Sequence, residues 1–366
     1  MHRTDADGHS SNQFTDGNPS LGVEATVVDA AFMNAVQEEV LYPIETKAGI
    51  TPVKGTWTQL GAALDMIMQG VSPGGRLTLE TGVGVSTADQ AGKTTVYYTP
   101  FRHNRIMVYD GTRWVWRTFT ELSQATTDAT KSPAAVAASK VYDVFVWLDS
   151  GTLRATRGPL WDSDTSRGTG AGKSELEFFE GRWVNAQAIT NGPAARRGLY
   201  VGTIASDASS QINDTLAKRG VWNTYWRTPR PMKVVDTTDS WNYTTATFRQ
   251  ARATTSNQLE YVVGLSEDPV GARVFATATN SGGITITTVG VGVDSTSVNS
   301  AIVFGGFAGN TAFSPGLNHA DYRGHPGIGR HTLVWLEWST ASGTTTWYGD
   351  NNSVATQAGI IGEMIG

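Results

Sequence analysis

The sequence predicts a mainly β protein: a short N-terminal helical region, then a β-rich body and a C-terminal β-sandwich of the jelly-roll kind. Three observations carry this prediction. Glycine accounts for 41 of the 366 residues, and serine and threonine runs are frequent, which is typical of short strands joined by tight turns. From Thr94 onward, apolar and polar residues alternate with a period of two. Marked helical periodicity is confined to the region before residue 72.

The rest of the composition excludes several classes of protein. The net charge of −5 at pH 7 gives no support to a nucleic-acid-binding surface, because phosphate contacts need clustered Lys and Arg. The absence of cysteine excludes disulfides, thiolate nucleophiles and cysteine zinc sites. No apolar run approaches the roughly 20 residues that span a bilayer, and the polar start does not resemble a signal peptide. We therefore expect a soluble protein made in a cytoplasm, without cofactor, nucleic-acid partner or membrane insertion.

The chain begins with a polar segment and a first predicted helix. Residues 1–20 are rich in Asp, Asn, Ser and Gly, and we expect a flexible arm, with docking onto a partner as the alternative. Thr26 is expected to cap the helix, Asp29 to favour the positive end of its dipole, and Pro43 to end it. In residues 25–45 (ATVVDAAFMNAVQEEVLYPIE) an apolar residue recurs at every fourth position and forms one stripe: Val28, Phe32, Val36 and Val40.

A second helix is marked by the residues TWTQ at 56–59, which match the capping-box pattern. Gly70 supplies its stop. Its apolar residues have the spacing of a short coiled-coil seam: Trp57, Leu60, Leu64 and Ile67. Two heptads are too few for an isolated coiled coil, but such seams become stable when attached oligomeric bodies raise their local concentration. The alternative is that both helices fold onto the β-rich body.

Composition and hydrophobic periodicity divide the remainder of the chain into three parts. Residues 73–93 are glycine-rich and weakly patterned, and we interpret them as a connector. The β-rich body is expected at residues 94–235, where residues 123–140 form either one short helix or a loop. Beyond residue 236 the predicted strands are short and are separated by short turns, with no helical segments between them. This pattern predicts a sandwich at residues 236–366. Three turn sequences predict hairpins in the body: Asp110-Gly111, Asp149-Ser150-Gly151 and Glu180-Gly181.

Two clusters in the C-terminal region are candidates for binding. His319, His325 and His331 recur at spacings of six, with Asp321 between them, and imidazole is a suitable ligand for zinc or nickel. The surrounding glycines and proline indicate a loop, and no pair has tight ligand spacing, so ordinary loop histidines are the alternative. The second cluster combines aromatic rings, which stack on sugars, with carboxylates, which accept hydroxyl hydrogen bonds: Trp335, Glu337, Trp338, Trp347, Tyr348 and Asp350.

This aromatic–acid cluster is our candidate for glycan or receptor contact. On a strand, Trp335 and Glu337 point to one face and Trp338 to the other. The alternative is that one tryptophan belongs to the core and that Glu337 is a satisfied buried acid. Glu337 and Asp350 also raise the possibility of glycoside hydrolysis, which needs two carboxylates facing each other across the scissile bond. No catalytic motif of the HExxH, GxSxG or P-loop type is present.

Several stretches resemble bacteriophage tail-fibre and related virion attachment proteins. Residues 14–40 (FTDGNPSLGVEATVVDAAFMNAVQEEV) and 49–67 (GITPVKGTWTQLGAALDMI) resemble the N-terminal region of that family. Further similar stretches lie in the body and at the end of the chain: residues 95–116, 142–147, 199–205, 219–232 and 327–350. The resemblance covers most of the chain, and its motifs are structural rather than catalytic.

The resemblance implies an elongated homotrimer and a structural role in a virion tail. It places residues 1–72 on other tail or baseplate proteins and residues 236–366 outward, where they would bind a host surface glycan or protein without catalysis. The implied trimer or particle contacts are Phe32, Val36, Trp57, Leu60, Leu64 and Ile67. Assembly in the host cytoplasm and release by lysis agree with the polar start of the chain. The alternatives are a polysaccharide-depolymerising spike and a purely structural head fibre or tail-tip adaptor.

Overall fold

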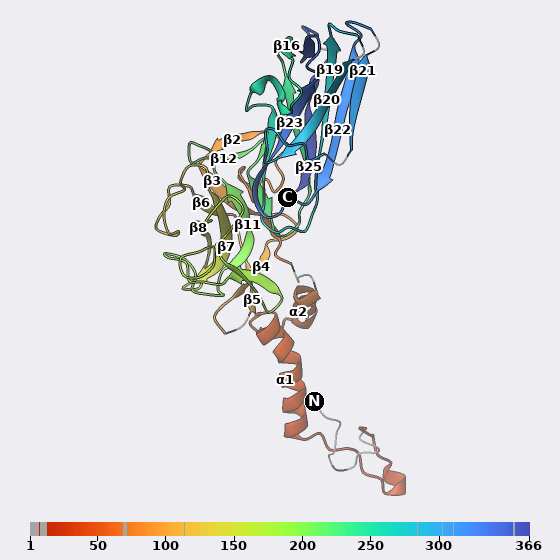
Figure 1. Cartoon of the computed structure of the whole chain (residues 1–366). Coiled ribbons are helices and arrows are strands. Elements are labelled where there is room, and N and C mark those ends of the chain that lie inside the picture. The colour runs from red at the N-terminus through yellow and green to blue at the C-terminus, as the bar shows by residue number, and fades with distance from the viewer. Residues whose placement is uncertain are drawn as a thin grey trace. The chain divides into compact units, whose positions relative to one another are not determined.

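The computed structural model describes residues 7, 13–68, 72–112, 114–283, 285–301, 303–309, 311–353 and 356–366. The protein is mainly β with a short helical region near its N-terminus, as the sequence predicts (Figure 1). Its internal contacts divide it into two compact units, Met1–Pro73 and Gly74–Gly366. In the described parts of the chain, every helix is too short or too polar to cross a membrane.

The first unit contains helix α1 (Ala30–Tyr42), which begins later than predicted. The carboxylate of Asp29 accepts a hydrogen bond from the backbone N of Phe32 at 2.7 Å, so Asp29 is the N-cap. The prediction that Thr26 caps the helix is therefore wrong. Thr26 Oγ1 instead accepts a hydrogen bond from the backbone N of Thr15 at 2.8 Å, and this bond joins the two ends of the segment that precedes the helix.

The segment before α1 folds back on itself, and one of its rings contacts the first turn of the helix. The ring of Phe14 meets the ring of Phe32 edge-on, with 5.0 Å between their centroids, and a 3₁₀ turn (Pro19–Leu21) reverses the chain. The arm predicted at residues 1–20 lies partly outside the described residues. At its other end, α1 stops one residue before the proline that was expected to end it, and a π-helical turn follows (Pro43–Lys47).

Helix α2 (Gln59–Met68) lacks the predicted capping box. The Gln59 side chain accepts a hydrogen bond from the backbone N of Val53 at 2.9 Å and donates one to the carbonyl of Thr51 at 2.9 Å. Because the amide of Gln59 binds the preceding loop, it cannot also reach back to the start of its own helix. The stop predicted at Gly70 lies outside the described residues.

The second unit begins with two small sheets. A three-stranded sheet has the order β1-β3-β6, and a separate hairpin joins β4 to β5. A six-stranded sheet has the order β8-β7-β11-β10-β9, with β14 also paired to β11. The strands of these sheets are β1 (Gly75–Thr78), β3 (Thr95–Pro100), β4 (Arg105–Tyr109), β5 (Trp114–Thr118), β6 (Leu122–Ala125), β7 (Val141–Asp149), β8 (Thr152–Leu160), β9 (Leu176–Phe179), β10 (Arg182–Asn185), β11 (Leu199–Ala205) and β14 (Val221–Asn223).

The three predicted hairpins are confirmed. They join β4 to β5, β7 to β8 and β9 to β10. In the turn between β7 and β8, Ser150 and Gly151 both have positive φ, and so do Glu180 and Gly181 between β9 and β10. Two-residue turns of this kind match the twist of the strands that they connect. Residues 123–140 contain the end of β6 and then a loop, with no helix.

A large sheet forms the C-terminal sandwich. Its order is β15-β25-β19-β22-β21-β20-β23-β18-β13-β12-β2, and β16, β17 and β24 are attached to it. Its strands are β2 (Gln90–Lys93), β12 (Ile212–Asp214), β13 (Lys218–Arg219), β15 (Pro229–Asp236), β16 (Ser240–Tyr243), β17 (Arg249–Gln250), β18 (Gln258–Val263), β19 (Val270–Asn280), β20 (Thr285–Val293), β21 (Val303–Gly309), β22 (Gly316–Gly324), β23 (Gly329–Ser339), β24 (Thr345–Tyr348) and β25 (Ala358–Ile365). A 3₁₀ turn (Ala251–Ala253) follows β17.

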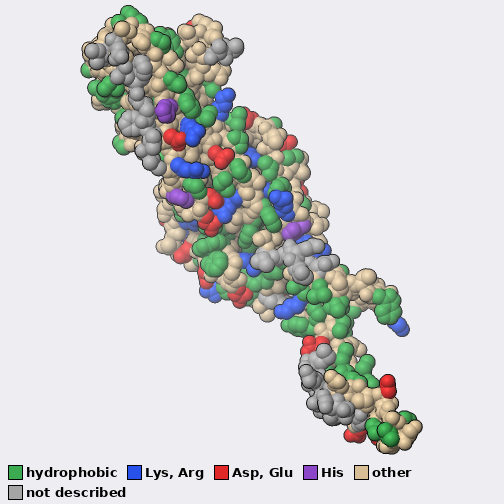
Figure 2. Space-filling model, turned by 90° about the vertical axis from the view of Figure 1, so that its right-hand side faces the viewer, with side chains coloured by type: hydrophobic (Ala, Val, Ile, Leu, Met, Phe, Trp, Pro, Cys, Tyr) green, Lys and Arg blue, Asp and Glu red, His purple; other side chains and the backbone are tan. Residues whose placement is uncertain are grey.

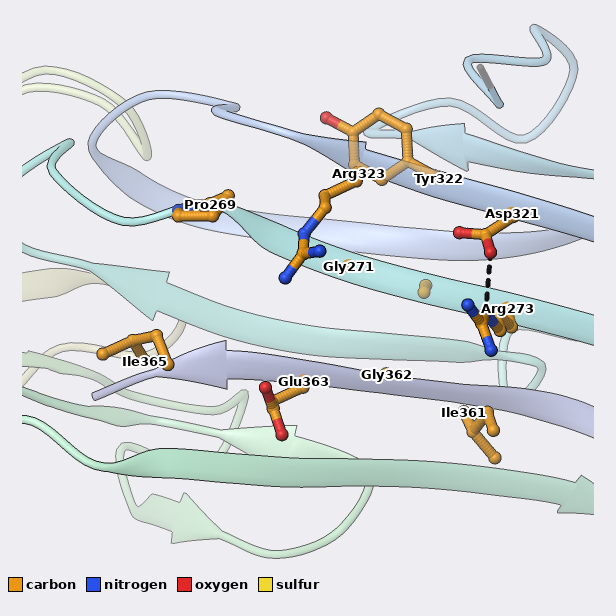
Figure 3. Close-up of a pocket in the computed structure, with 11 residues that line it drawn as sticks. Pro269, Gly271, Arg273, Asp321, Tyr322, Arg323, Ile361, Gly362, Glu363 and Ile365 are labelled. Carbon is orange, nitrogen blue, oxygen red and sulfur yellow. Dashed lines mark hydrogen bonds and ion pairs between the residues drawn. The ribbon is translucent and has the colours of Figure 1, made fainter. Parts of the chain in front are cut away.

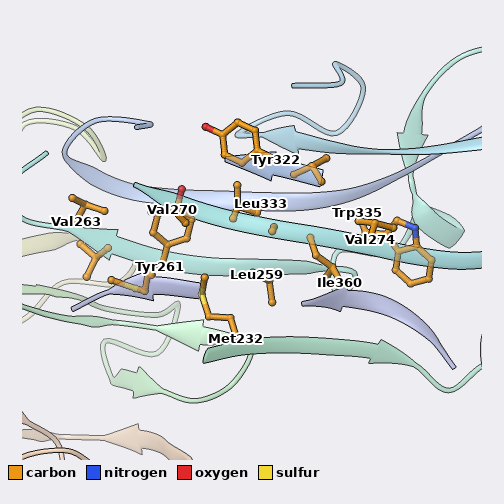
Figure 4. Close-up of a cluster of buried hydrophobic side chains, with 14 of the residues drawn as sticks. Met232, Leu259, Tyr261, Val263, Val270, Val274, Tyr322, Leu333, Trp335 and Ile360 are labelled. Atoms are coloured by element: carbon orange, nitrogen blue, oxygen red, sulfur yellow. The ribbon is translucent and has the colours of Figure 1, made fainter. Parts of the chain in front are cut away.

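Strand β21 pairs with both β20 and β22 and therefore joins the two layers of the sandwich. Along β19 the even-numbered residues are buried and the odd-numbered ones are at least partly exposed, so one face of its layer is core and the other faces outward. Figure 4 shows the core, where Val270, Val274 and Ile360 of one layer lie near Leu259 and Trp335 of the other.

Two predicted boundaries differ from the structure. The connector predicted at residues 73–93 contains β1 and β2, which belong to the sheets of the second unit. All four residues of β1 are buried, so the strand has no alternating pattern by which the sequence could reveal it. The boundary at residue 236 is also crossed: β15 pairs with β25 along its whole length, and one core includes Phe145 and Tyr200 of the body with Leu259 and Trp335 of the sandwich.

Asp236, the last residue of β15, supports a prediction on pH dependence. Its carboxylate accepts hydrogen bonds from Asn257 Nδ2 at 2.7 Å, Arg252 Nε at 2.8 Å and the backbone N of Thr238 at 2.9 Å. Burial opposes the charge, but these hydrogen bonds lower the pKa of Asp236 below its ordinary value. A lowered folded-state pKa stabilises the fold above the unfolded-state pKa of about 3.9, and this contribution is lost as the pH falls through the folded-state value.

We therefore expect Asp236→Asn to destabilise the protein at neutral pH and to become progressively less different from the wild type below about pH 4. Urea denaturation of both proteins across this pH range measures the difference in the free energy of unfolding. A difference that stays constant across the range would contradict the prediction.

Candidate functional site

The predicted trimer or particle contacts on α2 and just before it are exposed. Trp57 is 94% exposed, Leu60 37%, Leu64 46% and Ile67 40%. Phe32 and Val36 on α1 are partly buried. The buried cluster of this unit consists only of Ile44, Ala48 and Ala63 among the residues that the structure describes. Hydrophobic side chains also gather on the face of this unit that Figure 2 presents. The first unit therefore exposes most of the apolar seam that the sequence predicts.

The predicted glycan contacts on β23 and β24 are largely core residues. Trp335, Glu337 and Trp347 are 0% exposed. The interpretation of these three residues as glycan contacts is therefore corrected: β23 and β24 are each paired on both edges, and the three side chains are fully buried, which leaves them no access to a ligand. The other three members, Trp338, Tyr348 and Asp350, are partly exposed.

Glu337 is a satisfied buried acid, which is the alternative that the sequence left open. Its carboxylate accepts hydrogen bonds from Trp241 Nε1 at 2.6 Å, Arg249 Nε at 2.7 Å and the backbone N of Arg252 at 3.2 Å. Burial raises the pKa of Glu337, and these donors act in the opposite direction. Because Glu337 is enclosed and occupied, it is not available as one of two hydrolytic carboxylates with Asp350.

The three histidines are separated by the fold. His319 lies on β22 and His331 on β23, so the prediction of a single loop is wrong for these two, whereas His325 lies between the strands. His319 and His325 are exposed, but His331 is 3% exposed and its Nδ1 lies 2.7 Å from a carboxylate oxygen of Asp294. Burial opposes the charge of Asp294, but hydrogen bonds from His331 and Thr332 lower its pKa. Within the described ranges, no group of three or more His, Asp or Glu side chains is placed to hold a metal ion.

A groove that the sequence does not reveal lies on the outward face of the layer β15-β25-β19-β22. The groove has a volume of about 610 Å³ and opens to solvent. Figure 3 shows its charged residues on neighbouring strands, including the ion pair in which Arg273 Nε lies 2.7 Å from an Asp321 oxygen. Its lining combines charged, aliphatic and glycine residues, among them Pro269, Gly271, Arg273, Asp321, Arg323, Ile361, Glu363 and Ile365. Alternation within each strand marks these residues as outward, but their cross-strand register cannot be read from one sequence.

Comparison with known protein families and with curated proteins finds no match to the sequence. Among solved structures, the chain is similar to the insecticidal delta-endotoxin Cry8Ea1 from Bacillus thuringiensis, with a TM-score of 0.23 and 8% identity over 80% of this chain and 51% of that chain. For the mosquito-larvicidal Cry4Aa toxin from Bacillus thuringiensis the TM-score is 0.19, with 7% identity over 77% and 50%. For infectious bursal disease virus Gt strain it is 0.19, with 10% identity over 75% and 68%. The chain spans about half the length of the two toxin structures, and similarity at these TM-scores carries no inference about its function.

Proposed function

We propose that the chain is a homotrimeric attachment protein of a bacteriophage tail, a tail fibre that binds the host cell surface without catalysis. The observation that carries this proposal is the exposed seam of α2 in a chain whose second unit is well packed. Residues 1–72 would contact sister chains and other tail or baseplate proteins. The sandwich, residues 236–366, would meet a glycan or protein of the host surface.

Association of the chains is supported by the exposure of the apolar seam to water. Full burial of an aliphatic side chain contributes about 1.5–3 kcal/mol, so three exposed apolar residues on one short helix, with Trp57 just before it, favour association. A seam of two heptads is too short to hold helices together alone, but a folded β body on each chain raises the local concentration of the helices. Three copies of the sandwich on one particle would add avidity, so weak individual contacts suffice for adsorption.

The seam supports a prediction on oligomeric state. We expect the wild type to sediment as three copies of the 39.1 kDa chain and the double variant Leu60→Glu, Leu64→Glu to sediment as one, because two carboxylates on each helix cannot be buried unpaired. Ala62→Glu is the matched control: Ala62 is exposed and lies two residues along α2, on the opposite face from Leu60. A monomeric wild type, or a trimer that survives both seam substitutions, would contradict the proposal.

Two experiments test the function itself. Gold-labelled antibody against the second unit, applied to virions released by lysis of cells that carry the gene, should mark the tail. Fluorescently labelled full-length protein should bind cells of a susceptible strain, and purified capsule or lipopolysaccharide from that strain should release no oligosaccharide. Labelling absent from all particles would contradict the tail location, and released oligosaccharide would replace the fibre with a depolymerising spike.

A further inference from the structure

The groove on the outward face of the sandwich is centred on a glycine between two opposite charges. Gly271 of β19 is paired in register with Arg323 of β22 on one side and with Glu363 of β25 on the other. Figure 3 shows these two side chains on the strands that flank Gly271. Since neighbouring strands lie about 4.8 Å apart, the backbones that carry Arg323 and Glu363 are separated by about 10 Å.

Gly271 leaves a gap in the cross-strand set Arg323–Gly271–Glu363, because it has no side chain. A Cβ atom at Gly271 would meet only the carbonyl of Tyr322, at the ordinary contact distance of 3.5 Å, so the glycine is not required by local crowding. Its φ is not in the left-handed region, so the backbone does not require glycine either. What the missing side chain provides is open space between a cation and an anion.

The groove offers donors on one side and acceptors on the other. Arg273 and Asp321 form an ion pair in the next row, whereas Arg323 and Glu363 have no ion-pair partner among the residues that the structure describes. The Arg323 guanidinium can only donate hydrogen bonds and the ionised Glu363 can only accept them. The four side chains sum to zero charge, and Ile361, which is 44% exposed, adds an apolar surface beside them.

We propose that this groove binds a segment of an uncharged surface oligosaccharide. Hydroxyl groups both donate and accept, so one sugar can satisfy Arg323 and Glu363 at once, while the C–H faces of the sugars on either side of it lie on Ile361 and on Pro269. Because the four charges sum to zero, the groove has no net electrostatic attraction for a strongly acidic or a strongly cationic glycan. A volume of about 610 Å³ is within the usual range of small-ligand sites. This inference rests on the proposed attachment function and gives it a ligand class and a site.

The test compares three substitutions on the same sheet face. Gly271→Trp fills the groove, and Arg323→Gln removes the charged donor. Thr277→Trp is the control, because Thr277 is on the same strand and the same face, about 20 Å along the strand, and does not line the groove. The probe is the surface polysaccharide of a strain whose cells the wild type labels, cleaved to oligosaccharides and divided by anion exchange into neutral and acidic fractions. Isothermal titration calorimetry measures the affinity of each protein for each fraction.

We expect the neutral fraction to bind the wild type and Thr277→Trp equally. Arg323→Gln should bind it at least about tenfold more weakly, as loss of a charged hydrogen bond predicts. Gly271→Trp should bind it at least as weakly, because the indole occupies the groove. Wild-type affinity in Gly271→Trp, or binding of the acidic fraction alone, would overturn the site. Loss of trimer mass in Gly271→Trp would assign the groove to a sister chain instead. Cell labelling by the wild type that persists in both groove variants would refute the groove and leave the attachment function standing, whereas the absence of cell labelling would refute the function.

Discussion

The Asp143→Ala variant is expected to unfold with a free energy about 3–5 kcal/mol below that of the wild type, because it leaves a buried cation without its partner. The carboxylate of Asp143 on β7 is fully buried and pairs with Arg167, whose Nε lies 2.6 Å from one oxygen and whose Nη2 lies 3.0 Å from the other. It also accepts hydrogen bonds from Thr203 at 2.7 Å and Ser174 at 3.3 Å.

Arg167 extends the effect of this substitution across the second unit. Its guanidinium lies over the ring of Trp161, 4.2 Å from the centroid, and its Nη2 donates a hydrogen bond to the carbonyl of Gly264 at 2.8 Å, just beyond β18. Burial lowers the pKa of Arg167, but Asp143 and Tyr200 outweigh burial and raise it above its ordinary value. Because an arginine side chain keeps its proton in proteins, removal of the carboxylate leaves a charged guanidinium in the core. The buried charge pair of the β-rich body is thus also hydrogen-bonded to the backbone of the sandwich.

Chemical denaturation of three variants separates the charge pair from the packing. Ser174→Ala removes only the longest hydrogen bond to Asp143 and should cost no more than about 1 kcal/mol. The double variant Asp143→Leu, Arg167→Leu removes both charges, and we expect it to be less destabilised than Asp143→Ala alone. If Asp143→Ala lies within about 1 kcal/mol of the wild type, the pair does not hold the two parts of the unit together.

The features of the fold that the sequence predicted are the local ones. Hairpins such as Ser150-Gly151 and Glu180-Gly181 could be predicted because a two-residue turn with positive φ has a residue signature of its own. The predicted N-cap was placed at Thr26 instead of Asp29 because both residue types cap helices well. Only the hydrogen bond between Thr26 and Thr15 decides between them. Strand β1 was missed because it is buried throughout and therefore lacks alternation.

The candidate site was harder to predict because it depends on register. The pattern of β23 placed Trp335 and Glu337 on one face, but it could not say that the face is covered. Conversely, Gly271, Arg323 and Glu363 are separated by up to 92 positions in sequence and meet only because β19 lies between β22 and β25.

Substitution of Trp335 by alanine should lower the free energy of unfolding by about 3–5 kcal/mol, the usual cost of deleting a buried tryptophan side chain. Trp335 is fully buried, and its ring meets that of Trp241 nearly edge-on, with 5.9 Å between their centroids. The deletion removes apolar burial and leaves a cavity between the layers, which packed β structure closes only partly. In the described structure the indole Nε1 has no hydrogen-bond partner, so Trp335→Phe should cost much less than alanine.

The same variant distinguishes a core residue from a ligand contact. Trp338, on the same strand and on the opposite face, is partly exposed, and Trp338→Ala should cost only about 1–2 kcal/mol because less apolar area returns to water. Guanidinium denaturation gives both free energies. Saccharide affinity measured on folded Trp335→Ala at low temperature should equal that of the wild type, because Trp335 does not reach the surface. Unchanged stability together with lost saccharide binding would restore Trp335 as a glycan contact and require that β23 be uncovered in the assembled protein.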